Sequence, residues 1–150
     1  MKNASILWAL SFLLLAAACG PAAPQAVPPG TQPCEHCRMM IHDMRFHTQI
    51  SNANGKLRHF DSIECALLYR KNNPAQAAAF YASDFLHPGS YLPADSKDSV
   101  FLVSSKIKSP MGGGILAVRR QDAAALAAKF AANEKPLSEL QHSALPLEPR

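Results

Sequence analysis

Apolar and polar positions alternate along several short stretches in the middle of the chain, a period-two pattern that is typical of β-strands. The stretches expected as strands are 40–51, 57–60, 80–85, 100–103 and 115–118. The dipeptide Asn54-Gly55 between the first two is a strong hairpin signal. Two further stretches have a helical period: one begins near Asp61, with Glu64 completing a capping box, and the other is 122–133. This order predicts two α+β halves of about 50 to 60 residues, each too small to bury much apolar surface alone, which therefore pack together.

The N-terminal region has a different pattern. Lys2 precedes a continuous apolar run, 6–15, which is followed by three alanines and then by Cys19 and Gly20. This is the pattern of a secretory signal peptide, and the run is shorter than the ~20 residues that span a bilayer. The end of the run resembles a bacterial lipobox, in which the cysteine is lipidated and becomes the new N-terminus. We therefore expect residues 1–18 to be a lipoprotein signal peptide and Cys19 to be lipidated. Ordinary cleavage that leaves Cys19 as a free thiol is the alternative.

Such a protein would be lipid-anchored in the bacterial cell envelope and would face the periplasm. Gly20 offers no inner-membrane retention signal, so the outer membrane is preferred.

Three segments lack a sustained period. Residues 19–33 contain five prolines and no charge, which predicts a disordered, Pro-rich tether that lets the domain stand off the membrane. Residues 87–99 are expected to form a loop, and residues 134–150 a flexible tail. The folded domain is accordingly expected at 34–133.

Composition narrows the functional classes. A chain of 150 residues with 48% hydrophobic residues has room for one ordinary domain, which excludes a multidomain enzyme. The net charge of +4 is spread along the chain without a basic run interleaved with aromatics, so nucleic acid is not an expected partner. The 4 Cys, 5 Met and 6 His are unevenly placed, because eight of the fourteen residues in 34–47 are of these types.

Cys34 and Cys37 form a C-x-x-C motif that several chemistries use. Covalent haem attachment is excluded because Arg38 stands where a histidine is needed. A zinc site would need a second pair of ligands, and Cys65 is the only other cysteine after Cys19. A thioredoxin-like pair would sit at a helix start, whereas this motif follows a proline-rich segment and precedes a predicted strand. A disulfide, from Cys34 to Cys37 or from either to Cys65, stays open.

Methionine favours a different use of this motif. Thiolate and thioether sulfur are soft donors that prefer Cu(I) to zinc, calcium or magnesium. If 37–41 is extended, Cys37 and Met39 point to the same face. Met111 lies between a proline and three glycines, in a segment with little bulk to bury it, so a flexible loop could hold it near such a site.

The chain resembles the NosL family of copper-binding lipoproteins, the nitrous oxide reductase accessory proteins. The residues that carry the resemblance are Cys34-Glu35-His36-Cys37-Arg38-Met39 for a C-x-x-C-G-M hallmark, Phe60 to Tyr69, Tyr81 to Phe85, and 104–113 before an Ala-rich helix. It covers most of 33–132, and Arg38 replaces the glycine of the hallmark. The resemblance implies two small ββαβ-type units packed together, similar to organomercurial lyase.

The resemblance also implies a function and a ligand set. Cys37 and Met39 would bind Cu(I), with Met111 as third donor and Cys34 as a further candidate. The protein would be a copper chaperone and not an enzyme. Its partners would be a copper acceptor protein, such as nitrous oxide reductase with its ABC-type maturation transporter, and the membrane through the lipid on Cys19.

Two alternatives of other classes stay open. A periplasmic thiol-disulfide oxidoreductase would use Cys34 and Cys37 as its exchanging pair. An organomercurial-lyase-like enzyme would use cysteine thiolates with a carboxylate such as Asp61 or Asp84, and would need Cys65 close to Cys37. Packing as a small buried residue is the simplest expectation for Cys65.

Overall fold

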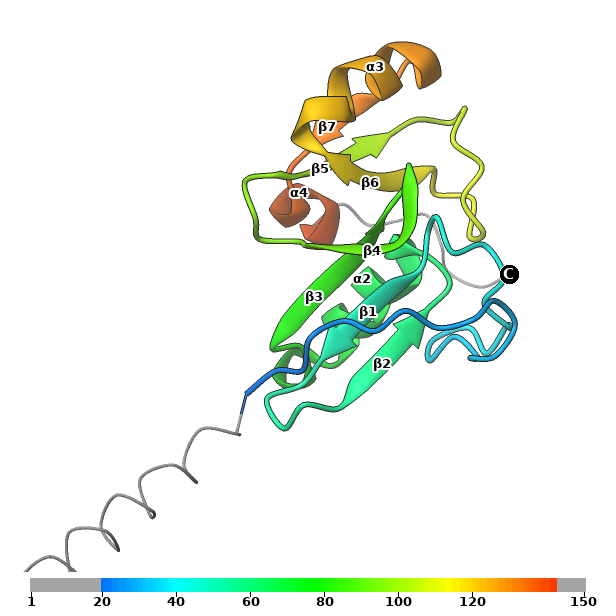
Figure 1. Ribbon diagram of the computed structural model, residues 1–150. Coiled ribbons are helices and arrows are strands. Elements are labelled where there is room, and N and C mark those ends of the chain that lie inside the picture. The colour runs from blue at the N-terminus through cyan, green and yellow to red at the C-terminus, as the bar shows by residue number, and fades with distance from the viewer. Residues whose placement is uncertain (1–19, 143–150) are drawn as a thin grey trace, which may run out of the picture.

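The fold is built on one mixed sheet, and the computed structural model describes residues 20–142. The strands in this range are β1 (Thr48–Ser51), β2 (Leu57–Phe60), β3 (Ala79–Asp84), β4 (His87–Pro93), β5 (Ser99–Val103), β6 (Ile115–Arg119) and β7 (Asn133–Lys135). The helices are α2 (Ile63–Asn72), α3 (Arg120–Phe130), α4 (Leu137–His142) and the 3₁₀ turn η1 (Pro74–Gln76). The strand order is β2-β1-β3-β6-β5-β7, and β4 pairs with β3 (Figure 1).

The chain folds as two similar units. In β1-β2-α2-β3 the first strand lies between the other two, and β5-β6-α3-β7 repeats this arrangement. The predicted α+β class with two ββαβ-type units is therefore confirmed. Alternate residues of β5 and β6 face two apolar cores: Phe101 and Ile115 belong to the core that α2 covers, and Leu102 and Leu116 to the core that α3 covers.

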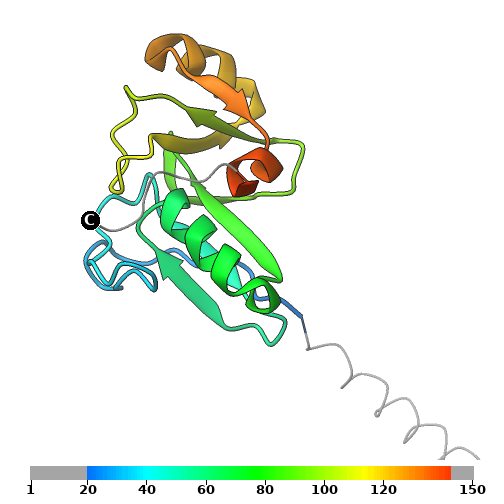
Figure 2. The same cartoon turned by 180° about the vertical axis from the view of Figure 1, so that it is seen from behind.

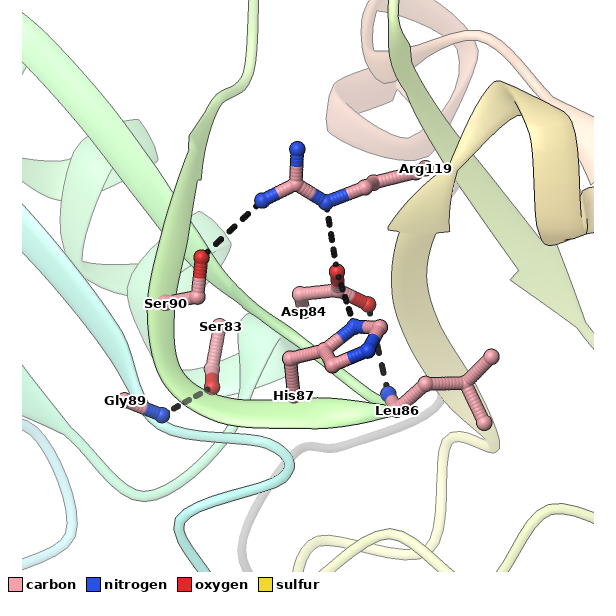
Figure 3. A network of polar contacts seen from close by, with 7 residues as sticks. All are labelled: Ser83, Asp84, Leu86, His87, Gly89, Ser90 and Arg119. Carbon is pink, nitrogen blue, oxygen red and sulfur yellow. Dashed lines mark hydrogen bonds and ion pairs between the residues drawn. The ribbon is translucent and has the colours of Figure 1, made fainter.

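A buried carboxylate lies where the two units meet. β3 and β6 pair in parallel at Asp84 and Ala117. The Asp84 carboxylate accepts hydrogen bonds from Arg119 Nε at 3.0 Å and from the Leu86 N–H at 3.2 Å, and it lies 3.0 Å from His87 Nδ1 (Figure 3). Because these groups compensate its burial, Asp84 has a structural explanation at the junction of the units.

The two faces of β1 have different covers. Ile50 packs in the core against α2, which lies on one side of the sheet (Figure 2). Strand side chains alternate, so Gln49 and Ser51 point to the other side, along which residues 20–33 run (Figure 1). The Ala22 N–H donates to Ser51 Oγ at 2.8 Å, and the Gln25 N–H donates to Gln49 Oε1 at 2.9 Å. The Gln49 amide in turn donates to the Gln25 carbonyl at 2.5 Å.

These bonds correct the expectation of a free tether over the described part of 19–33. The segment is extended, as its prolines predict, but it lies against the sheet. The physical reason is that Gln49 and Ser51 are fully buried polar side chains on this side of β1, and backbone groups of Ala22 and Gln25 supply hydrogen-bond partners for them.

The C-terminal boundary also differs from the expectation. Part of the expected tail forms β7, which pairs with β5. Another part forms α4, whose Leu140 is 5% exposed and belongs to the core that α2 covers. Likewise, β4 occupies much of the expected loop 87–99. In both cases pairing with another strand outweighs the local pattern: β7 pairs with the distant β5, and β4 with the preceding β3. Within residues 20–142 no helix is long and apolar enough to cross a bilayer. The predicted signal peptide, Cys19 and residues 143–150 lie outside the described range.

The attachment of residues 20–33 can be tested through Gln49. The Gln49→Ala variant removes both bonds to Gln25, which at about 1 kcal/mol each should raise hydrogen exchange of the Gln25 amide by at least tenfold. Asn54→Ala at the exposed hairpin tip is the matched control and should leave this rate unchanged. A Gln25 amide that exchanges in wild type as fast as in an unfolded peptide would show that the segment is a free tether.

Candidate metal centre

The C-x-x-C motif forms a closed loop. The Cys34 N–H donates to the Met39 carbonyl at 2.8 Å, and the Arg38 N–H donates to the Cys34 carbonyl at 3.0 Å. Arg38 has φ +67°, the left-handed region that favours glycine. The glycine of the family hallmark is thus replaced by a residue that keeps a glycine conformation. The condition that 37–41 is extended is not met, because Arg38 within this stretch has a positive φ.

The loop is fixed to β2 by two contacts. The Glu35 N–H donates to the His59 carbonyl at 2.8 Å, and the Glu35 carboxylate accepts a hydrogen bond from Arg58 Nη1 at 2.8 Å. Since β2 leads directly into α2, these contacts bring the loop to the start of that helix.

The second part of the site is the first turn of α2. Ser62 caps the helix, accepting the Cys65 N–H at 3.2 Å. The cap lies one residue later than the expected Asp61, and it leaves the Asp61 carboxylate free to face the loop. Asp61 Oδ2 lies 3.5 Å from Cys37 Sγ.

Together these elements assemble a thiol cluster, which we define as Cys34, Cys37, Asp61 and Cys65. One ligand atom from each lies within 4.8 Å of the other three. Cys34 and Cys65 are fully buried, Cys37 is partly exposed, and all three thiols are free. Asp61 Oδ1 is buried and has no hydrogen-bond partner among the described residues.

The three thiols of the cluster differ in pKa because each one affects its neighbours. A hydrogen bond from Cys65 lowers the pKa of the Cys34 thiol to about 6. The same bond, together with burial, raises the pKa of Cys65. Burial and the neighbouring Cys34 sulfur raise the pKa of Cys37 to about 11. Of the three thiols, Cys34 is therefore the one whose thiolate form the cluster favours, through the hydrogen bond from Cys65.

This donor set suits a soft metal ion. A thiolate–metal bond is about 2.3 Å long, so two sulfurs on one ion are at most about 4.6 Å apart. The sulfurs of the cluster already lie near that limit. Thiolates are soft ligands that suit Cu(I). Beside them, the buried Asp61 Oδ1 has no hydrogen-bond partner among the described residues, so one polar atom of the site is still unsatisfied.

The structure places the predicted site residues in three settings. Cys34 and Cys37 lie in the thiol cluster. Met39 follows them on the same loop with its side chain 50% exposed. Met111 is partly buried and, like Cys37, packs against the core that contains Cys34 and Cys65. The assignment of Cys34, Cys37, Met39 and Met111 as ligands remains a prediction, because the cluster itself includes neither methionine.

Sequence reasoning brought Cys65 to the C-x-x-C loop only in two of its alternatives, a disulfide and a lyase-like site that used Asp61 or Asp84. It did not include Cys65 or Asp61 in the predicted copper ligand set. Cys65 is buried, as its simplest reading implied, but it is also a member of the cluster. The carboxylate beside the thiols is Asp61, whereas Asp84 belongs to the network at the junction of the units.

Known proteins with related sequences or folds decide the family. A family model described as NosL matches residues 27–142. The chain belongs to the NosL family. No curated protein matches the chain by sequence. Among solved structures, the crystal structure of the copper chaperone NosL from Shewanella denitrificans is similar with a TM-score of 0.64 and 21% identity, covering 79% of this chain and 96% of that chain. This likeness confirms that the chain has the NosL fold.

Alkylation of the metal-free protein can test whether the thiols of this NosL-family cluster affect one another's pKa. With a pKa of about 11, Cys37 should react with iodoacetamide tens of times more slowly at pH 7 than an ordinary exposed cysteine. The Cys34→Ser variant removes the neighbouring sulfur that raises this pKa, so alkylation of Cys37 should accelerate. Mass spectrometry of the labelled peptide gives the rates, with Cys65→Ser as the companion variant. An alkylation rate of Cys37 that does not change in Cys34→Ser would contradict the coupling.

Proposed function

We propose that this NosL-family protein is an extracytoplasmic copper chaperone that binds Cu(I) and passes it on without catalysing a reaction. The observation that carries the proposal is the thiol cluster: three free thiols and a carboxylate within 4.8 Å of one another, with Cys37 partly exposed. Family membership and the fold shared with a copper chaperone support the same conclusion.

The candidate sulfur donors differ in their exposure to solvent. Cys34 and Cys65 are fully buried, Cys37 is partly exposed, and Met39 reaches into solvent. We propose Cys34, Cys37, Met39 and Met111 as Cu(I) ligands, and the structure adds Cys65 as a thiol close enough to join them. An exposed sulfur at the edge suits transfer, because an acceptor can add its own donor before the last bond to this protein breaks.

Binding requires the loss of protons, because a metal is bound by the thiolate and not by the thiol. Cys34 already favours the thiolate, whereas Cys37 and Cys65 retain their protons at neutral pH. Asp61 Oδ2 beside Cys37 is the polar group placed to receive its hydrogen bond. Cu(I) uptake is therefore expected to release protons and to strengthen as the pH rises.

The proposed setting is the bacterial cell envelope, with the protein anchored through lipid on Cys19 and preferentially on the outer membrane. The proposed acceptor is nitrous oxide reductase, reached with its ABC-type maturation transporter. The pattern of residues 1–20 supports the first point, and family membership supports the second. Attachment of residues 20–33 along β1 would hold the domain closer to such an anchor than a free tether would.

One observation in the structure favours the lyase-like alternative. The organomercurial-lyase-like reading needed Cys65 close to Cys37, and both lie in the thiol cluster beside Asp61. Copper handling is preferred because the family match extends over residues 27–142. Incubation with an arylmercury compound separates the two functions, since a lyase would release the free arene and a copper chaperone would only bind the compound.

Competition with a Cu(I) chelator under anaerobic conditions tests the proposed function. The wild-type protein should show one tight site. Removal of second-layer partners of metal sites already costs about 10- to 100-fold in affinity, so Cys37→Ser should cost about 100-fold or more. Met39→Ala should cost about tenfold, because it removes a weaker thioether donor.

Met40 is the matched control for Met39. It is the next residue, also a methionine, and 44% exposed, so Met40→Ala should leave the Cu(I) affinity unchanged. Equal affinity of the wild type, Cys37→Ser and Met39→Ala would refute the ligand assignment.

A further inference from the structure

Met111 lies in the loop between β5 and β6, and a buried carboxyl group holds this loop. The Glu64 side chain is fully buried, and its Oε1 accepts a hydrogen bond from the Ser109 hydroxyl. Ser109 Oγ in turn accepts the Gly114 N–H at 2.9 Å. Ser109 and Gly114 are the two ends of the segment that carries Met111. Ser109 is therefore bonded to Glu64 of α2 directly, and Gly114 is connected to it through Ser109. We call this set of contacts the Glu64 latch.

The loop backbone fits closely onto the latch. A Cβ atom at Gly113 would lie 2.7 Å from Glu64 Cγ and 2.8 Å from its Oε1, closer than side-chain atoms pack. Gly114 has φ +69°, and a Cβ there would lie 2.2 Å from the Ser104 carbonyl oxygen. The two glycines therefore allow an approach that side chains would prevent.

The latch and the thiol cluster share one turn of helix. Glu64 directly precedes Cys65, and the Ser62 cap fixes the first turn that carries both. Figures 1 and 2 agree that the loop between β5 and β6 extends toward the C-x-x-C loop. Met111, like Cys37, packs against the core that contains Cys34 and Cys65.

Packing alone does not explain a carboxyl group at this position. Burial of Glu64 costs free energy that an apolar side chain would not cost, and its Oε2 has no hydrogen-bond partner among the described residues. What the carboxyl provides is a directed acceptor for Ser109, and through Ser109 a fixed position for the loop.

We propose that the Glu64 latch positions Met111 at the thiol cluster, so that Glu64 and Ser109 are positioning residues of the copper site. The inference rests on the proposed function and adds a structural cause for the third sulfur donor. The latch touches no metal: it acts through Met111. Its loss should therefore weaken copper binding only as long as Met111 is present.

A double-mutant cycle tests this dependence. Cu(I) affinities are measured by chelator competition for wild type, Ser109→Ala, Met111→Ala and the double variant. Ser109→Ala should cost about tenfold, as expected for loss of an outer-layer contact, and the double variant should bind no more weakly than Met111→Ala. Ser109→Thr keeps the hydroxyl and should recover most of the affinity. Ser83→Ala is the control and should bind Cu(I) like wild type. Ser83 is a buried serine of β3 whose hydroxyl accepts a hydrogen bond from the Gly89 N–H.

Two results of the cycle itself would overturn the proposal, and a third would remove its premise. The first is an unchanged affinity of Ser109→Ala when Met111→Ala weakens binding, and the second is additive losses in the double variant. If Ser109→Ala fails to fold in a urea titration, Gly113→Ala replaces it in the cycle, since its methyl group displaces the loop from Glu64. If Met111→Ala binds like wild type while Cys37→Ser does not, the latch proposal fails and the copper function stands. If Cys37→Ser also binds like wild type, the proposed function itself fails.

Discussion

The first turn of α2 is the constraint on which the site depends. The Ser62 hydroxyl caps this turn by accepting the Cys65 N–H, so the cap fixes the turn that carries Glu64 and Cys65 directly after Asp61. Asp61 faces Cys37, Cys65 points into the thiol cluster, and Glu64 holds the loop that carries Met111. A helix start is well suited to this task, because its backbone is rigid while its first N–H groups favour negative charge nearby. The turn thus brings the third thiol of the cluster, Cys65, to the C-x-x-C loop.

The NosL-family fold gives this turn its neighbours. Two ββαβ units share one sheet through β3 and β6, so the loop between β5 and β6 of the second unit reaches α2 of the first. Residues 20–33 cover the polar side of β1 and then lead directly into Cys34. The thiol cluster is therefore assembled from the N-terminal stretch and the first unit, and the second unit contributes the loop that carries the proposed donor Met111. The partly exposed edge at Cys37 and Met39 is where such a site meets solvent and partners.

Much of the fold follows from local patterns in the sequence. Asn54-Gly55 and the strand at 57–60 agree with the structure, as does the start of a helix close to Asp61. Other features depend on contacts between residues far apart in sequence. The pairing that forms β7 and the docking of 20–33 have no local signal, because proline content describes an extended chain but not what it lies against. Cys37 and Met39 would share a face only if 37–41 were extended, yet Arg38 takes a left-handed conformation that is usual for glycine. The position of Cys65 beside the C-x-x-C loop is likewise a product of tertiary packing.

The central claim is that the C-x-x-C loop and the start of α2 form one sulfur-rich site for Cu(I). X-ray absorption spectroscopy at the copper edge of the Cu(I)-loaded wild-type protein tests it most directly, because the spectrum reports the oxidation state and the donor atoms together. The account predicts an edge typical of Cu(I) and a first shell of two or three sulfur atoms, reduced by one in Cys37→Ser. A first shell of nitrogen and oxygen donors, or a spectrum unchanged in Cys37→Ser, would contradict it.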